Sequence, residues 1–175
     1  MHDLEIVGQV LRGRKDEFRL LMDRYSGLCR YYYEKRWGFD TETALDLTQE
    51  LFLKAFRNLH SLIPGSSFKA WLMTIARNLA IDHHRKKGRK EEEERSFIDV
   101  PGESPEQTAL KIMLVREVLD KIPARQREAM ELRYVWDLTS AEIGKIMNLP
   151  EGTVRSDLYY ARIRLLELLE TDESL

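Results

Sequence analysis

The segment from Pro150 to Leu169, PEGTVRSDLYYARIRLLELL, carries side chains suited to reading DNA. Its second half has the apolar spacing of an amphipathic helix, whereas its first turn contains Gly152, Thr153, Arg155 and Ser156. Small residues let a helix end approach another surface, free backbone N–H groups there bind phosphate, and Arg and Ser side chains reach base edges. The alternative is a helix with an ordinary solvated face that follows a glycine-containing turn.

A second segment, from Phe68 to Lys90, has the charge of a surface that binds a polyanion. It contains seven Lys and Arg residues against one acid, Asp82. The net charge of the chain is −2, yet residues 1–90 hold 17 Lys+Arg and 11 Asp+Glu, and residues 91–175 hold 11 and 19. The balances of +6 and −8 indicate a polyanionic partner for the first half.

The other reactive residue types do not form a catalytic or metal-binding set. His83 and His84 are adjacent, and because adjacent helical residues point roughly 100° apart they cannot share an ion. We expect both in the basic surface. Cys29 is the single cysteine, which excludes an internal disulfide, fits a reducing compartment and predicts a packing role. The sequence contains no glycine-rich phosphate loop or catalytic carboxylate pair, so we expect no enzyme and no cofactor.

Helices must position these residues, because apolar side chains recur at three- and four-residue steps along the chain. These positions are Phe18, Leu21, Met22, Tyr25 and Leu28, then Leu45, Thr48, Phe52, Ala55, Phe56 and Leu59, then Phe68, Leu72, Ile75 and Leu79. No alternating Val/Ile/Thr run of strand length occurs. The predicted fold class is all-α.

The stretch LTSAEIGKIMNLPEGTVRSDLYYARIRLL predicts a helix-turn-helix. Its first helix begins at a capping box of Thr139 and Glu142, and the connection is NLPEG. We expect Ile143, Ile146, Met147 and Leu149 to pack against Val154, Leu158, Ala161 and Leu165. In such a motif the N-terminal end of the second helix enters the major groove of DNA.

A polar segment divides the chain into two predicted domains. The run KKGRKEEEERSFIDVPGESPEQ changes from basic to acidic and then carries Gly and Pro, as an exposed linker does. A helix is predicted after it, with Ser104 as N-cap, Pro105 in the first position and Gln107 closing a capping box. The predicted boundaries are 1–88 for the first domain, 89–104 for the flexible linker and 105–175 for the second domain.

A membrane location is not expected. No apolar run approaches the roughly 18 residues that a membrane span needs, and the first residues lack the apolar core of a signal peptide. We therefore expect a cytoplasmic protein.

Three motifs in one order carry a family resemblance. They are DLTQELFLKAFRNL, then SSFKAWLMTIARNLAIDHHRKKGR, then LDKIPARQREAMELRYVWDLTSAEIGKIMNLPEGTVRSDLYYARIRLLELL. Together they resemble regions two and four of the extracytoplasmic-function (ECF) sigma factors of the sigma-70 family, over nearly the whole chain. The resemblance implies an alternative sigma factor whose partners are core RNA polymerase, through its clamp coiled coil and flap, promoter DNA and an anti-sigma factor.

The family docks its DLTQE helix on the polymerase clamp, which implies a polymerase-binding role for Asp46, Gln49 and Glu50. These residues lie three and four apart and share one helical face. Leu45, Phe52 and Phe56 are expected to hold the helix in its own domain. A solvated stripe of an amphipathic helix would show the same polar spacing.

Two DNA surfaces follow from the resemblance. In region two, the loop from Ile63 to Ser67 would cover a flipped base of the minus-10 element, and the next helix would line the path of the single strand. The residues implied are Ser66, Ser67, Trp71, Arg77, Asn78, Arg85, Lys86 and Lys87, with Trp71 either stacking on a base or packing in the core. For the minus-35 element the residues implied are Gly152, Thr153, Arg155, Ser156, Tyr159 and Arg162.

Two positions depart from the family, which commonly has basic residues where this chain has Asp157 and Tyr160. Because an acid near DNA repels phosphate, Asp157 either pairs with Arg125, Arg133 or another cation, or accepts a hydrogen bond from cytosine N4. Two other function classes stay open on the sequence. One is a self-sufficient helix-turn-helix repressor or activator, and the other is a nucleic-acid-processing enzyme, for which the sequence offers no metal or acid/base set.

Overall fold

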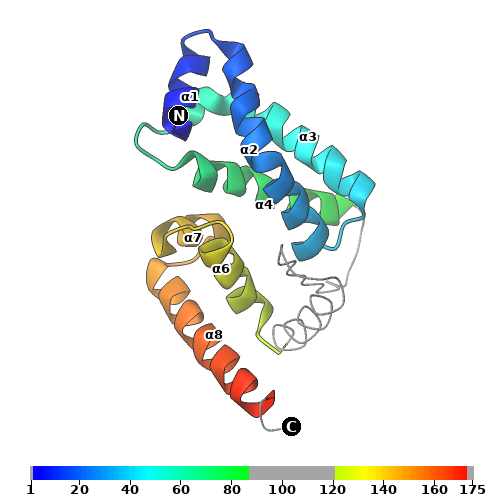
Figure 1. Ribbon diagram of the computed structural model, residues 1–175, viewed down its shortest axis with the longest axis vertical. Helices are drawn as coiled ribbons and strands as arrows, with labels where there is room; N and C mark the ends of the chain where they lie inside the picture. Colours follow the sequence, from blue (N-terminus) through cyan, green and yellow to red (C-terminus); the bar gives the residue numbers. More distant parts are fainter. Residues whose placement is uncertain (1, 87–120, 173–175) are drawn as a thin grey trace. The chain divides into compact units, whose positions relative to one another are not determined.

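The computed structural model describes residues 2–86 and 121–172, and all regular structure in these ranges is helical (Figure 1). The chain divides into two compact units, Met1–Glu93 and Glu94–Leu175. The all-α prediction is confirmed for the described residues. Lys87, the predicted linker 89–104 and the predicted helix start at Ser104 lie outside them.

The described part of the first unit, residues 2–86, contains four α-helices with short helical turns between them. These are α1 (Asp3–Leu11), a 3-10 turn (Lys15–Glu17), α2 (Phe18–Tyr31), a π-helical turn (Tyr32–Arg36), α3 (Thr41–Asn58), a 3-10 turn (Leu59–Ser61) and α4 (Phe68–Lys86). Helix α3 packs against both α2 and α4. The core between them includes the buried side chains of Leu21, Leu51, Phe52, Phe68 and Leu72.

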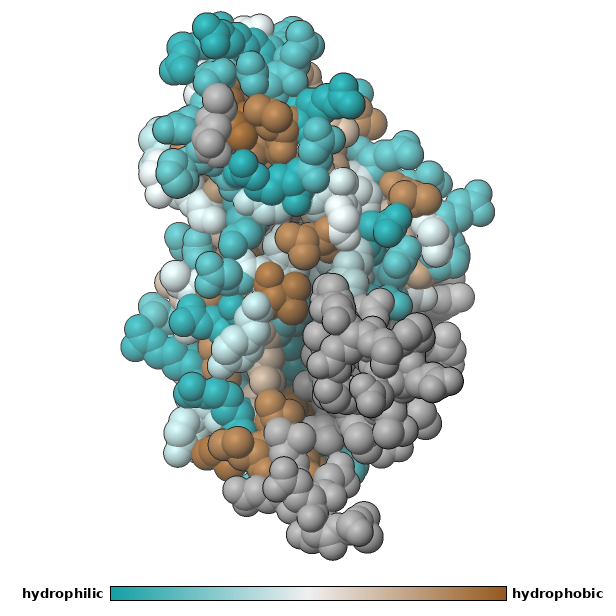
Figure 2. All heavy atoms as spheres, in the orientation of Figure 1, coloured by the Kyte–Doolittle hydropathy of each residue, from teal (hydrophilic) through white to brown (hydrophobic). Residues whose placement is uncertain are grey.

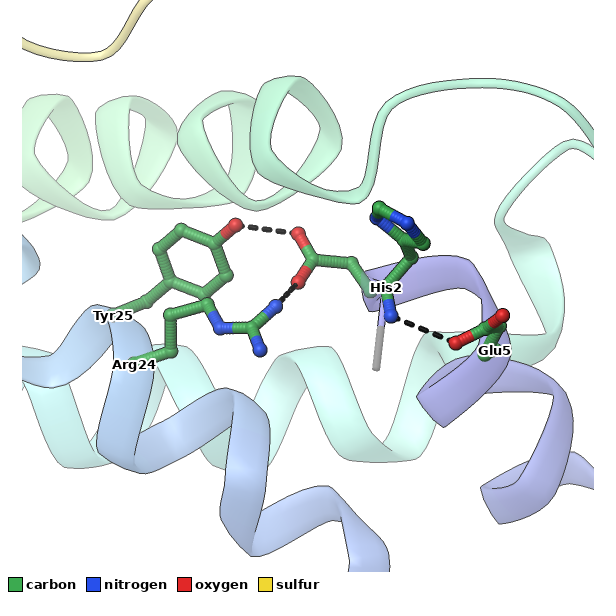
Figure 3. Close-up of polar contacts among 5 residues, drawn as sticks. His2, Glu5, Arg24 and Tyr25 are labelled. Carbon is green, nitrogen blue, oxygen red and sulfur yellow. Dashed lines mark hydrogen bonds and ion pairs between the residues drawn. The ribbon is translucent and has the colours of Figure 1, made fainter.

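Helix α1 is tied to α2 by the carboxylate of Asp3. This carboxylate accepts hydrogen bonds from the guanidinium of Arg24 and the hydroxyl of Tyr25 (Figure 3). Burial and the neighbouring Asp3 raise the pKa of Tyr25 above its usual value. At the start of α1 the backbone N–H of His2 donates to Glu5 Oε2 at 2.8 Å, which caps the helix.

A π-helical turn, Tyr32–Arg36, ends α2 and changes which side chains face the core. Tyr32 and Tyr33 are adjacent and both fully buried, and the Tyr33 hydroxyl donates to the carbonyl of Ala76 at 3.2 Å. Beyond the turn, Phe39 contacts His84, with ring centroids 4.9 Å apart.

The two histidines at the end of α4 belong to this aromatic cluster. His84 also lies 5.2 Å from Trp37, and His83 lies 5.0 Å from Phe39. Both side chains are half-buried. The expectation that both lie in the basic surface holds only for the part of each ring that stays exposed, because aromatic rings beyond the π-helical turn pack against the rest.

The second unit contains α6 (Ala124–Tyr134), α7 (Ser140–Met147) and α8 (Glu151–Asp172). The predicted capping box is confirmed: Glu142 N–H donates to Thr139 Oγ1 at 3.3 Å, and Thr139 N–H donates to Glu142 Oε2 at 2.8 Å. The core contains the predicted residues Ile143, Ile146, Met147, Val154, Leu158 and Ala161, together with Leu132, Trp136 and Leu138. Leu165 instead packs on Ile122 and Ala161, while Leu149 is half-buried.

Several apolar residues lie at the surface, where hydrophobic patches appear between hydrophilic side chains (Figure 2). Met22 and Leu45 are exposed, although their spacing predicted core positions. Phe56 is partly exposed and rests against Phe18, with ring centroids 5.1 Å apart. Among the described helices, none has the length and hydropathy of a membrane span.

Candidate nucleic-acid and polymerase-binding surfaces

The turn between α7 and α8 fixes the angle of α8 through close backbone contact. A Cβ at Gly144 would lie 2.7 Å from the carbonyl oxygen of Leu149, so only glycine fits there without movement. Leu149 N–H donates to the Gly144 carbonyl at 2.8 Å, and Asn148 ends α7 in the left-handed conformation (φ 57°). The chain then starts α8 directly after Pro150.

One face of the first two turns of α8 is exposed, while Val154, Asp157 and Leu158 on the other face are buried. Gly152 is exposed, and a Cβ there would meet no atom within 4 Å. The Arg155 side chain is 72% exposed and forms an ion pair with Glu151 in the preceding turn. The Ser156 hydroxyl donates to the Gly152 carbonyl at 3.0 Å, so its oxygen stays available as an acceptor.

Three further residues predicted to contact the minus-35 element lie in or beyond this part of α8. Thr153 is half-buried and its N–H donates to the Pro150 carbonyl at 3.0 Å. Tyr159 is exposed, with its ring 5.4 Å from that of Tyr160, and Arg162 is exposed. The structure thus leaves these residues exposed or half-buried between the first and the fourth turn of α8.

Asp157 pairs with Arg125, which is one of the alternatives left open by the sequence. Arg125 Nε and Nη2 donate to Asp157 Oδ2 and Oδ1, both at 2.8 Å. The hydrogen bond and charge of Asp157 raise the pKa of Arg125. Arg133 instead donates to the Leu138 carbonyl at 2.9 Å. Asp157 is buried, so it does not present its carboxylate to a base edge.

The loop before α4 is held by its own serines. Gly65 has φ +81°, and Ser66 donates from both N–H and hydroxyl to the carbonyl of Ile63, at 3.0 and 2.6 Å. Ser67 Oγ accepts from Ala70 N–H at 3.2 Å, which caps α4. Both predicted minus-10 serines therefore shape the loop, whatever else they contact.

Helix α4 presents its other predicted residues unevenly. Trp71 is half-buried, and its ring is tilted against Phe68 with centroids 5.8 Å apart. Arg77 is half-buried, whereas Asn78 is exposed. Arg85 and Lys86 are exposed in the last described turn.

The polymerase-binding residues predicted on α3 share an exposed face with apolar side chains that the sequence interpretation missed. Asp46, Gln49 and Glu50 are exposed, and Glu50 pairs with Lys54 at 3.1 Å. Leu45 and Leu53 are 42% and 57% exposed on the same side of α3. The four-residue step from Gln49 to Leu53 is the signal that could have found this mixed face.

The geometry of the described residues bears on two further expectations, a metal site and the role of Cys29. Within the described residues no three His, Cys, Asp or Glu side chains come together as a possible metal site. Cys29 is fully buried, and burial raises the pKa of its thiol to about 12, so it packs as predicted and is a poor nucleophile.

Comparisons with known proteins divide the chain in the same way. The family model described as Sigma-70 region 2 matches residues 21–90, and the model described as Sigma-70, region 4 matches residues 112–165. Two solved structures share the fold. One is CnrH in complex with the cytosolic domain of CnrY, with TM-score 0.68 and 23% identity, covering 97% of this chain and 98% of that one.

The second solved structure is the sigma factor RpoE in complex with the anti-sigma factor NepR from Bartonella quintana. Its TM-score is 0.64 and its sequence identity 28%, and the match covers 90% of this chain and 97% of that one. Among curated relatives, the ECF RNA polymerase sigma factor BldN of Streptomyces coelicolor is 34% identical over 98% of this chain and 67% of its own length. The ECF RNA polymerase sigma factor SigW of Bacillus subtilis is 30% identical over 93% of this chain and 94% of its own length. This chain therefore belongs to the extracytoplasmic-function branch of the sigma-70 family and is an alternative sigma factor.

Proposed function

We propose that residues 1–88 of this sigma factor bind core RNA polymerase and the minus-10 element, and that residues 105–175 bind the minus-35 element. The observation that carries the proposal is the exposed face at the start of α8, where Gly152 is open and Arg155 projects, while the opposite face is packed in the helix-turn-helix core. A helix end with unpaired N–H groups and a bidentate donor is suited to phosphate and base edges.

The exposed face of α3 is the proposed polymerase-binding surface. Asp46, Gln49 and Glu50 supply polar contacts, and Leu45 and Leu53 supply apolar area beside them. A mixed face of this kind is typical of a surface that binds a protein partner. Its polar groups fix the position of the partner, and its apolar area stabilises the contact when it is buried.

The α3 assignment is tested by replacing Asp46, Gln49 and Glu50 together with Ala. Affinity for core polymerase should fall by about 1 kcal/mol per lost contact, more where charge is involved, while the unfolding midpoint stays unchanged. Glu42→Ala, an exposed acid in the first turn of α3, is the matched control. A triple variant that is captured by core as well as the parent removes the assignment.

The proposed minus-10 surface combines the Ser66–Ser67 loop with α4. Trp71, Arg77 and Asn78 lie along the helix, and the exposed cations Arg85 and Lys86 lie at its end, next to Lys87. A single strand needs such a cationic track with a group that receives an unstacked base. Trp71 can stack on an unstacked base only if its ring turns an edge or a face away from its contact with Phe68.

In the minus-35 surface each side chain has a separate role. Arg155 is the bidentate base reader, while Ser156 and Tyr159 add single contacts. The backbone at Gly152 and Thr153 approaches the duplex, and Arg162, seven residues beyond Arg155, binds phosphate.

Further partners are proposed from the relatives. RpoE and CnrH are solved with NepR and CnrY, and we extend an anti-sigma partner to this chain. On core polymerase we propose contacts with the clamp coiled coil and the flap. We also propose that the chain has no catalytic activity of its own and acts in the cytoplasm, beside the polymerase.

The decisive experiment is transcription in vitro with sigma-free core polymerase, with and without this chain. Promoter-specific transcripts are expected only when both are present. A self-sufficient repressor or activator would bind its site tightly without core polymerase, so duplex binding that is equally tight with and without core would contradict the proposal.

A further inference from the structure

Along its first three turns, α8 carries a central ridge and two sides of different charge. Gly152, Ser156 and Tyr159 are exposed at steps of four and three residues, so they form the ridge that faces away from the core. Arg155 and Arg162 lie seven residues apart along one side of this ridge, and both are exposed. That side therefore has cations of its own.

The opposite side faces α6 and looks deficient in positive charge. Thr153, Asp157, Tyr160 and Arg164 follow one another at steps of four, three and four residues. Asp157 and Tyr160, which carry no positive charge, lie in the middle of this side. Arg164 is the single cation that α8 itself places on this side, and its Nε donates to the Lys121 carbonyl at 2.8 Å.

Helix α6 supplies the missing charge through Arg125. The guanidinium of Arg125 is held in a two-point hydrogen bond by Asp157, whose side chain is 5% exposed, while the Arg125 side chain is 57% exposed. Nη1 takes no part in this pair, so it points its N–H groups elsewhere. A cation of fixed orientation thus stands beside the second turn of α8.

Phosphates border the major groove on both sides, so a helix lying in the groove is stabilised by cations on both of its sides. We infer that Arg125 binds a backbone phosphate of the minus-35 element on the α6 side of α8, and that Asp157 is the positioning residue that holds its guanidinium there. This inference rests on the proposed entry of α8 into the major groove. The buried acid at position 157 then favours DNA binding, because a guanidinium that is already oriented loses little side-chain freedom when it contacts phosphate.

The test compares the parent with the Arg125→Gln, Asp157→Asn double variant. Both have zero net charge at this pair and can hydrogen-bond between α6 and α8, so they differ in the exposed cation and its buried counter-charge but not in net charge. The holoenzyme is titrated with the promoter that the parent holoenzyme selects from a randomised library, at 50 to 200 mM salt. The slope of log affinity against log salt should become shallower by about 0.9, which makes the loss of affinity over this range about threefold smaller than the parent's. A parent-like slope and affinity overturn the inference.

Two controls separate this contact from folding and from the function itself. The swapped pair Arg125→Asp, Asp157→Arg keeps an ion pair and a cation on this side, so it should keep the parent's slope. A slope as shallow as that of the neutral pair would mean that disturbed packing causes the loss, which also overturns the inference. If Arg155→Ala changes minus-35 preference while the neutral pair binds like the parent, only the inference fails; if Arg155→Ala has no effect either, the placement of α8 fails with it.

Discussion

Helices α4 and α8 both carry residues proposed to bind DNA, but Arg85 and Lys86 lie at the end of α4, whereas Arg155 lies near the start of α8. The exposed cations of α4, Arg85 and Lys86, lie in its last described turn, where they also stabilise the negative end of the helix dipole. Arg155 lies in the second turn of α8, where the dipole gives a cation no support, and it pairs with Glu151 one turn earlier. The helix dipole therefore explains the cations of α4 but not Arg155, which contributes to helix stability through its ion pair with Glu151 instead.

The segments that precede the two helices also differ, in how tightly each fixes the direction of its helix. Helix α8 follows a turn in which the backbone of Leu149 touches Gly144, so its angle is fixed by steric contact. Helix α4 follows a loop that is held by serine hydroxyls, with open space around Gly65. Duplex reading demands a fixed angle, whereas capture of a single strand tolerates adjustment.

The largest effect is expected from Gly144→Ala. A methyl group at this position must displace backbone, which should lower the free energy of unfolding of the second unit by about 2 kcal/mol and weaken minus-35 binding more than tenfold. Chemical denaturation and promoter titration measure the two effects.

Gly152→Ala is the matched control for that variant, because nothing lies within 4 Å of its Cβ. Its stability should stay equal or rise by up to about 1 kcal/mol, while DNA affinity falls. Thiol labelling of buried Cys29, which reports the first unit alone, should be as slow as in the parent for both variants. Faster labelling in Gly144→Ala would show that its effect is not confined to the second unit.

Arg155→Ala is expected to have the next largest effect. Loss of a bidentate base contact should cost about 1–3 kcal/mol and relax preference at one position of the minus-35 element. Transcription from a promoter library with substitutions across that element measures both. An activity profile with the parent's height and shape would show that this helix end does not read DNA.

Replacing Arg85, Lys86 and Lys87 with Ala should affect strand opening more than stability. Helix stability should fall by at most about 1 kcal/mol for each cation removed, and single-strand binding should lose about 0.7 of salt slope per phosphate contact. Permanganate reactivity of promoter thymines reports the opening. If the thymines of the variant's promoter complex stay as reactive as the parent's, these cations only stabilise the helix. The comparison with α8, whose cations are proposed to bind DNA, would then no longer concern two DNA-binding helices.

The smallest effect is expected from Gly65→Ala. Its φ of +81° strains any L residue although no atom crowds the site, so the first unit should lose about 1 kcal/mol of stability. Minus-10 opening should persist once the variant is folded, in contrast with the loss of DNA binding in Gly144→Ala. Loss of opening without loss of stability would show that the loop is as tightly constrained as the α7–α8 turn.

The regular parts of both units could be predicted from the sequence because local signals define them. Thr139 and Glu142 carry their capping box in four residues, and the apolar spacing of α7 and α8 is sustained over several turns. Leu45 was wrongly assigned to the core because α3 carries apolar residues on two faces, and their spacing alone does not show which face is buried. The partner of Asp157 was not decided by spacing, since Arg125 and Asp157 meet only after α6 packs on α8.

His83 and His84 show the same limit. Their neighbours in sequence are basic, but the rings that cover them come from the segment after α2, more than forty residues earlier in the chain. That segment is positioned by the π-helical turn Tyr32–Arg36, for which the sequence carries no simple pattern.

The π-helical turn bears on how insertions and deletions are tolerated at the end of α2. A π turn holds one more residue than an α turn, so it absorbs a single inserted residue while the helix before it and the chain after it keep their places. Deleting Lys35 would close the turn to regular α-helix and rotate the following residues by roughly 100°, which would carry Trp37 and Phe39 away from the end of α4. A relative that lacks one residue here is therefore best aligned with its gap inside residues 32–36, and its aromatic cluster must be built from different positions.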